Sequence, residues 1–288
     1  MKTSELLTHL GNRLEDPSEV NYTAVEKKQA LDQASDAVAN LIEWKYLTHL
    51  ETVTSTITFA ENETSKSFSD VFGNGNLRPL RDGIQNIYCE QYSNTVAVNK
   101  YIDVIPFLDN DSSYFQGTTA VPVAYLNDDK VFISPVNATD TAGNNTKFKV
   151  YYYKLPYKHI KETKTTFVFT ASSNAITTSD TSIDFISAGF EIGQKLLISG
   201  SGTDANNTYV DVTAVTSTTL TVSAINSDQS TGTSITLDTL DNLGSNLDPI
   251  LLDYAESILW YEDNKVDRAS RARDSAITQV NILNARWY

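Results

Sequence analysis

The sequence predicts an α+β fold: a helical bundle built from both chain termini, with a β-rich middle that includes a small β-sandwich or barrel insertion. Apolar residues recur at helical spacing near both ends, while the middle alternates short β-branched and aromatic runs with polar turns. We therefore expect three regions. Residues 1–60 plus 246–288 form the helical body, residues 61–160 are β-rich, and residues 161–245 form an inserted small β domain.

The N-terminal region predicts two helices. Thr3 or Ser4 can cap the first, which carries a leucine stripe and stops at Asp16-Pro17. A capping box, Thr-Ala-Val-Glu at residues 23–26, starts the second. Its charged residues, including Lys27, fall mostly opposite an apolar face. That face consists of Leu31, Ala34, Val38, Leu41 and Ile42.

The C-terminal region mirrors this arrangement. Asp248 is a candidate N-cap with Pro249 at the first helical position, and a second helix begins after residues 262–264. The first helix has an apolar stripe of Ile250, Leu251, Tyr254, Ala255, Ile258 and Leu259. The second has Val266, Ala269, Ala276, Val280, Leu283 and Trp287. Because neither chain end can bury its stripe alone, we expect the two ends to pack together.

The middle of the chain predicts short strands joined by polar turns. In and before the first β region, the expected strands are Thr52–Phe59, Val96–Ile102, Val131–Ile133 and Lys147–Tyr153. In the inserted domain they are Phe167–Thr170, Lys195–Ser199, Tyr209–Val215, Thr219–Ala224 and Ser234–Leu237. Ser217-Thr218 is expected to turn a hairpin between two of them.

Composition excludes several classes of protein. The net charge of −14 and pI of about 4.6 disfavour sequence-specific nucleic-acid binding. They suit the surface of a channel through which DNA passes without being bound. Cys89 is the single cysteine, so neither a disulfide framework nor a cysteine metal site is expected. No stretch is long enough to span a membrane and no apolar signal core is present, so we expect synthesis in a cytoplasm.

No motif predicts catalysis, a metal site or a cofactor. The three histidines, His9, His49 and His159, lack ligand partners at helical or hairpin spacing, so each is expected at the surface or partly packed. Residues 109–111 begin like a calcium loop, but Gly and Glu are missing from the required later positions. The glycine-rich segment Gly200-Ser201-Gly202 is not followed by the Lys-Ser/Thr of a phosphate-binding loop. We therefore expect a protein that is not an enzyme.

The last helix carries the candidate contact residues. Its cluster of Arg268, Arg271 and Arg273 has two interpretations: a solvated face balanced by nearby aspartates at i, i+4-type spacing, or an intersubunit contact. The aromatic pair Trp287-Tyr288 is costly to leave in water, so we expect it to dock on the chain's own helices or on a partner. The candidate intersubunit contacts are Arg268, Arg271, Arg273, Trp260, Trp287 and Tyr288.

Several segments resemble proteins of tailed phages. Arg13–Asp16 and Tyr22–Glu26 with the helix to Ile42, and Leu247–Ala255 with the helix after it, resemble the helical ends of head–tail connector adaptors. Val131–Pro135 and Val150–Pro156 are similar to stretches in phage virion proteins. Phe190–Gly200 through Thr219–Val222 resembles a small β module of tail and neck proteins. The β insertions are larger than in a minimal helical adaptor, so the station in the neck (adaptor, stopper or tail terminator) stays open.

The resemblance implies a structural virion protein at the head–tail junction, assembled in the host cytoplasm. It would form a ring with copies of itself, a dodecamer in the family. One face would bind the portal protein and the other would bind stopper or tail proteins, while DNA passes through the channel without sequence-specific contacts. The alternative is a tail or baseplate component with a glycan- or receptor-binding β domain, which the Thr/Ser-rich module and the 15 tyrosines would suit.

Overall fold

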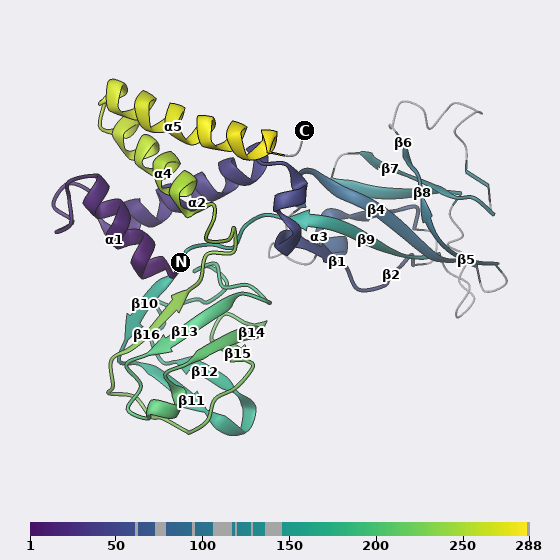
Figure 1. The fold of residues 1–288 in the computed structure, drawn as a ribbon. Coiled ribbons are helices and arrows are strands. Elements are labelled where there is room, and N and C mark those ends of the chain that lie inside the picture. Colours follow the sequence, from purple (N-terminus) through teal and green to yellow (C-terminus); the bar gives the residue numbers. More distant parts are fainter. Residues whose placement is uncertain are drawn as a thin grey trace. The chain divides into compact units, whose positions relative to one another are not determined.

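The computed structural model describes residues 1–60, 63–72, 79–93, 96–105, 117–118, 120–127, 129–135 and 146–286. The fold is mixed α+β, with helices at both termini and three mostly antiparallel sheets (Figure 1). The chain divides into two compact units, Met1–His49 with Pro156–Tyr288 and Leu50–Leu155. The helices of both termini and the strands of the predicted insertion therefore share one unit.

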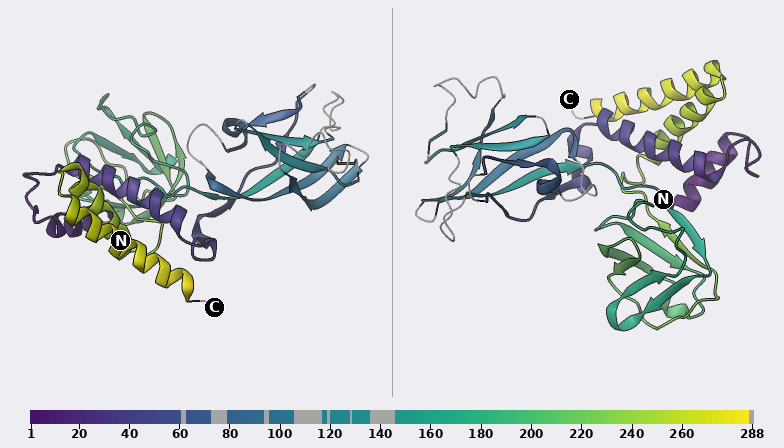
Figure 2. Two further views of the ribbon diagram at one scale, coloured as in Figure 1. Left: turned by 90° about the horizontal axis from the view of Figure 1, so that it is seen from above. Right: turned by 180° about the vertical axis from the view of Figure 1, so that it is seen from behind.

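Helices from the two chain ends pack together in the first unit, as predicted (Figure 1; Figure 2). Both N-terminal helices contact α4, which also packs along α5. Their bounds are Thr3–Arg13 for α1, Ala24–Leu41 for α2, Asp248–Glu262 for α4 and Val266–Ala285 for α5. The buried leucines of α1 and the small and branched residues of α2 supply the shared apolar surface.

Local capping rules held at α2 and failed at α1 and α4. The N-cap of α4 is Leu247, so Asp248 is the first residue of the helix and Pro249 the second. The capping box of α2 is confirmed: Glu26 N donates to Thr23 Oγ1 at 3.3 Å, and Thr23 N donates to Glu26 Oε2 at 2.7 Å. The prediction for α1 was wrong, because Lys2 is the N-cap and the hydroxyl of Thr3 instead donates to the backbone oxygen of Thr239. Leu41 is 44% exposed, not in the core, because α2 ends there and Ile42 turns inward in extended backbone.

The strands of the predicted insertion form one seven-stranded sheet in the order β10-β16-β13-β14-β15-β12-β11. Their bounds are Lys161–Lys164 (β10), Phe167–Thr170 (β11), Ala175–Thr178 (β12), Lys195–Ser199 (β13), Tyr209–Val215 (β14), Thr219–Val222 (β15) and Ile235–Thr239 (β16). All five expected strands are present, and β14 and β15 pair through the expected hairpin. The described strands do not close into a barrel, because the end strands β10 and β11 are not paired with each other.

The sheet surrounds its own apolar core. Sixteen buried side chains contributed by the strands and their connecting loops form one cluster, in which Phe167, Phe185 and Phe190 are fully covered. Sequence patterns missed β10 and β12. Strand β10 reads Lys-Glu-Thr-Lys, so it has no apolar alternation and is defined only by its pairing with β16.

The second unit, Leu50–Leu155, contains the other two sheets. The first has β1 (Glu51–Val53), β2 (Ile57–Thr58), β4 (Pro79–Ser93), β5 (Val96–Ile102) and β9 (Lys147–Lys154). The second has β3 (Ser65–Ser67), β6 (Val104–Ile105), β7 (Val123–Asn127) and β8 (Lys130–Ser134), with the short helix α3 (Phe68–Phe72). The strand expected at Thr52–Phe59 is broken into β1 and β2, which both pair with β9. Residues 109–111 lie outside the described residues.

Candidate subunit interface

Trp260 is buried at the turn between α4 and α5. Its side chain is 3% exposed, and its Nε1 donates to Glu256 Oε1 at 3.0 Å. The ring of Tyr22 meets it edge-on at 6.0 Å, while Lys265 Nζ and Arg268 Cζ lie 4.4 and 4.9 Å from its ring centroid. The indole therefore joins the α1–α2 loop to the α4–α5 hairpin and supports two cations, but it is not part of the exposed surface.

The three candidate arginines project from the first half of α5. All three are exposed, and the Arg268 guanidinium lies 4.0 Å from Glu15 Oε2. Arg271 Nε donates to the backbone oxygen of Asp267 at 3.1 Å. Within the described ranges, neither Arg271 nor Arg273 forms an ion pair with a carboxylate. The predicted balance by aspartates at i, i+4-type spacing is therefore not formed by these two side chains.

The other two candidates, Trp287 and Tyr288, lie outside the described residues. Their place as intersubunit contacts stays a prediction.

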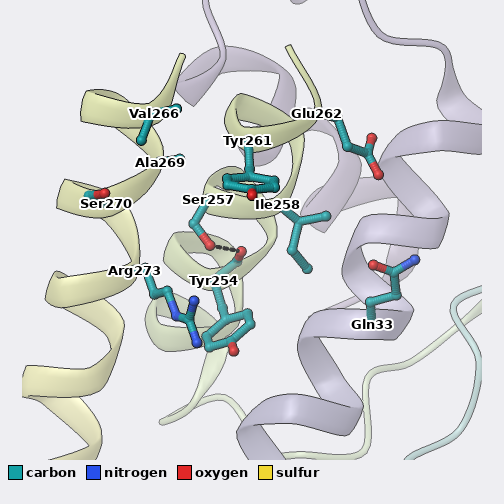
Figure 3. Close-up of a pocket in the computed structure, with 10 residues that line it drawn as sticks. All are labelled: Gln33, Tyr254, Ser257, Ile258, Tyr261, Glu262, Val266, Ala269, Ser270 and Arg273. Atoms are coloured by element: carbon teal, nitrogen blue, oxygen red, sulfur yellow. Dashed lines mark hydrogen bonds between the residues drawn. The ribbon is translucent and has the colours of Figure 1, made fainter. Parts of the chain in front are cut away.

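A groove of about 450 Å³ runs beside the arginines, between α5 and α2 with α4 as its floor (Figure 3). Tyr254, Ile258 and Tyr261 of α4 project into it, and Ser257 Oγ donates to the Tyr254 backbone oxygen at 2.6 Å beneath them. Gln33 of α2 stands on one wall. Val266, Ala269, Ser270 and Arg273 of α5 form the other.

The groove leaves apolar surface in solvent. Tyr261 is 69% exposed and Val266 is 53% exposed, although both are large apolar side chains. A second hollow of about 400 Å³ lies next to it around the start of α5, lined by residues 264–268 and Arg271. Apolar side chains flanked by unpaired arginines form the kind of surface that protein partners bind. Sequence patterns missed the groove, since Tyr254 and Ile258 were assigned to a buried stripe.

Lys27 is buried, which corrects its predicted position on the polar face of α2. It is 1% exposed, and its Nζ donates to the backbone oxygen of Asp16 at 2.9 Å and lies 3.6 Å from Asp16 Oδ2. The same carboxylate accepts backbone N–H bonds from Val20, Asn21 and Tyr22. Although burial opposes it, these donors and the ammonium lower the pKa of Asp16. The buried pair therefore organises the loop between α1 and α2.

His159 is also buried, which corrects the expectation of a surface or partly packed histidine. Its Nδ1 lies 3.0 Å from Asp32 Oδ1, and its Nε2 lies 3.4 Å from Asp241 Oδ1. Burial alone would lower the pKa of His159, but the two carboxylates outweigh it and raise the pKa to about 9. The imidazolium thus connects α2 to both chain segments that lead into and out of the seven-stranded sheet.

A third carboxylate lies in this region. Asp248, at the start of α4, is 1% exposed, and one of its oxygens lies 3.5 Å from the Met1 amine. Burial raises the pKa of Asp248, and the amine opposes that rise. Among the residues that the structure describes, no set of three or more His, Cys, Asp or Glu side chains is placed to hold a metal ion.

No protein-family model and no curated protein matches this chain. Within the described part of the chain, no helix combines the length and the apolarity that crossing a membrane requires.

Proposed function

We propose that this chain is a ring-forming structural protein of a tailed-phage virion, an adaptor at the head–tail junction and not an enzyme. A dodecameric ring docks beneath the portal, binds stopper or tail proteins on its other face and surrounds the DNA channel. The helices of both termini act as one bundle, and strands β10 to β16 act as a β-sandwich inserted into it. The resemblance of both helical ends to connector adaptors supports this assignment.

The observation that carries the proposal is the exposed groove beside the unpaired arginines of α5. Tyr261 and Val266 leave apolar surface in water, and Arg271 and Arg273 lack carboxylate partners among the described residues. A neighbouring copy can supply both kinds of contact, because the chain carries a net charge of −14 and is mostly acidic outside α5. A ring repeats such a contact at every subunit boundary.

The assembly should depend on the arginine face. Reversing two charges with Arg271→Glu and Arg273→Glu changes the charge of this face by four units and places two carboxylates opposite an acidic neighbour, so self-association should weaken at least about tenfold. Sedimentation velocity over a concentration series measures this. The matched control, Lys130→Glu with Lys195→Glu, makes the same change in net charge at two exposed lysines that do not belong to α5 or its groove and should assemble like the wild type.

Two results would contradict the proposal. One is a wild-type protein that stays monomeric up to about 1 mM, where even a contact of millimolar affinity is populated. The other is equal weakening by the control pair, which would assign the effect to net charge and not to the groove.

A second candidate function, a tail or baseplate component that binds glycans, has one observation in its favour. Tyr88, Tyr101 and Tyr151 form an aromatic row on β4, β5 and β9, with ring centroids 5.3 and 5.6 Å apart. Tyr101 is 57% exposed, and an ion pair between Lys149 and Glu90 at 2.6 Å borders the row. Rings that expose apolar faces beside polar groups suit sugar rings.

This alternative has its own test. If the row binds glycans, Tyr101→Ala should weaken binding to at least one member of a panel of bacterial surface polysaccharides about tenfold, measured by biolayer interferometry. Tyr209→Ala is the control, because Tyr209 is similarly exposed at 52% but lies on β14 in the other unit. Absence of binding to the whole panel would remove the alternative.

A further inference from the structure

The loop between α1 and α2 exposes a second, different surface. Val20 is 81% exposed and Val25, in the first turn of α2, is 57% exposed. The acidic residues around them, Glu15, Glu19 and Glu26, are also exposed. Branched apolar side chains in water, with exposed carboxylates nearby in the chain, are the chemical complement of an apolar groove beside unpaired arginines.

Contacts within the subunit already fix the conformation of this loop. The Asp16 carboxylate accepts three backbone N–H bonds from the segment 20–22, and the buried Lys27 anchors it from α2. Tyr22 is fixed from the other side, since its hydroxyl donates to Asp263 at 3.1 Å. A rigid loop loses little conformational entropy on docking, so its apolar contacts contribute more fully to affinity.

The loop and the groove are two different patches of one subunit. Val25 and Gln33 are eight residues apart on α2, which separates their side chains by about 80° around the helix axis. Gln33 stands on the wall of the groove, whereas Val25 lies beside a separate hollow with Lys28 and Lys161. A contact between two different patches of the same chain joins subunits head to tail, and repetition of that contact closes a ring or extends a filament.

We propose that the α1–α2 loop of one copy occupies the α2–α4–α5 groove of the next copy. This inference rests on the proposed function and names the two surfaces that form each boundary of the ring. Val20 and Val25 cover Tyr261 and Val266, and Glu19 and Glu26 pair with Arg271 and Arg273. Each subunit uses its loop on one side and its groove on the other.

Cysteine pairing with a short bismaleimide cross-linker tests the contact. Val20→Cys with Ser270→Cys in one chain should produce a ladder of covalent multimers, because every subunit has both reactive partners. A mixture of the two single variants should stop at a covalent dimer. The native Cys89 can stay in place, because it is fully buried and burial raises its pKa to about 11.

The outcomes separate this inference from the proposed function. Val20→Cys with Ser173→Cys, an exposed site in the seven-stranded-sheet region, is the placement control and should give no ladder. If the wild type assembles but Val20→Cys with Ser270→Cys gives no ladder, the loop-in-groove contact is wrong and the ring proposal stands. If the Ser270→Cys single variant cross-links to itself, the contact is two-fold symmetric and the inference is also wrong. If the wild type is monomeric at all concentrations, both proposals fail.

Charge and apolar variants provide a second readout. Val20→Asp and Tyr261→Asp each change a well-exposed side chain, so both variants should fold. Alone, each should be monomeric, because every boundary contains one damaged surface. Mixed, they should form a heterodimer and nothing larger, because only one of the two possible contacts joins an intact loop to an intact groove. A mixture that stays monomeric while the wild type assembles would contradict the head-to-tail arrangement.

Discussion

Replacement of His159 by alanine is expected to lower the free energy of unfolding of the helix-bearing unit by about 3–5 kcal/mol at neutral pH. The imidazolium lies between Asp32 and Asp241, with Asp248 close by, so its removal leaves the buried carboxylate of Asp241 without its compensating cation. Tryptophan fluorescence during urea unfolding measures this unit alone, because all three tryptophans, Trp44, Trp260 and Trp287, belong to it.

The same centre predicts a pH dependence. The pKa of His159 is about 9 in the folded chain and close to 6.5 in an unfolded one. Its stabilising contribution is therefore complete below pH ~6.5, falls as the pH rises, and is lost above pH ~9, a total of roughly 3 kcal/mol. The His159→Ala variant should lack this part of the slope. Equal slopes in variant and wild type between pH 6.5 and 9 would show that the imidazole is not charged in the folded state.

Replacement of Lys27 by alanine is expected to cost about 2–4 kcal/mol in the same fluorescence assay. The substitution removes the buried ammonium that faces Asp16 and leaves a cavity where the lysine stem packed. Lys27→Met is the matched control, because it keeps most of the stem volume and removes only the charge. It should lose clearly less stability than the alanine variant. Two variants that both unfold like the wild type would mean that the pair does not hold the α1–α2 loop.

Sequence patterns located the four helices at the chain ends, although not the short α3, because each helical face depends on residues within one or two turns. The capping box at Thr23 needs only Glu26, three residues later, and both follow the expected geometry. The strands of the seven-stranded sheet were found wherever apolar alternation marks an inner face, as in Tyr209–Val215. Strand β10 was missed because its polar residues become a strand only by pairing with β16, about seventy residues later.

The candidate interface was only partly predictable. Arginines clustered on one helix can be read from the sequence, but whether they are neutralised depends on which carboxylates lie within reach in space. Asp263 illustrates this, because it pairs with Lys265 and Tyr22 and so is not a partner of the arginines farther along α5. The groove could not be predicted at all, since its walls come from α2 and α5 and its floor from α4.

By itself the sequence determined the α+β class, the helical ends and most of the strands, since each depends on the periodicity of neighbouring residues. Only the tertiary structure decided the burial of Lys27 and His159, whose charged partners come from other elements of the fold. The physical reason is that burial of a charged side chain has a large desolvation cost, which only an oppositely charged group beside it offsets. A helical wheel shows which face a residue occupies, but not which distant carboxylate will meet it there.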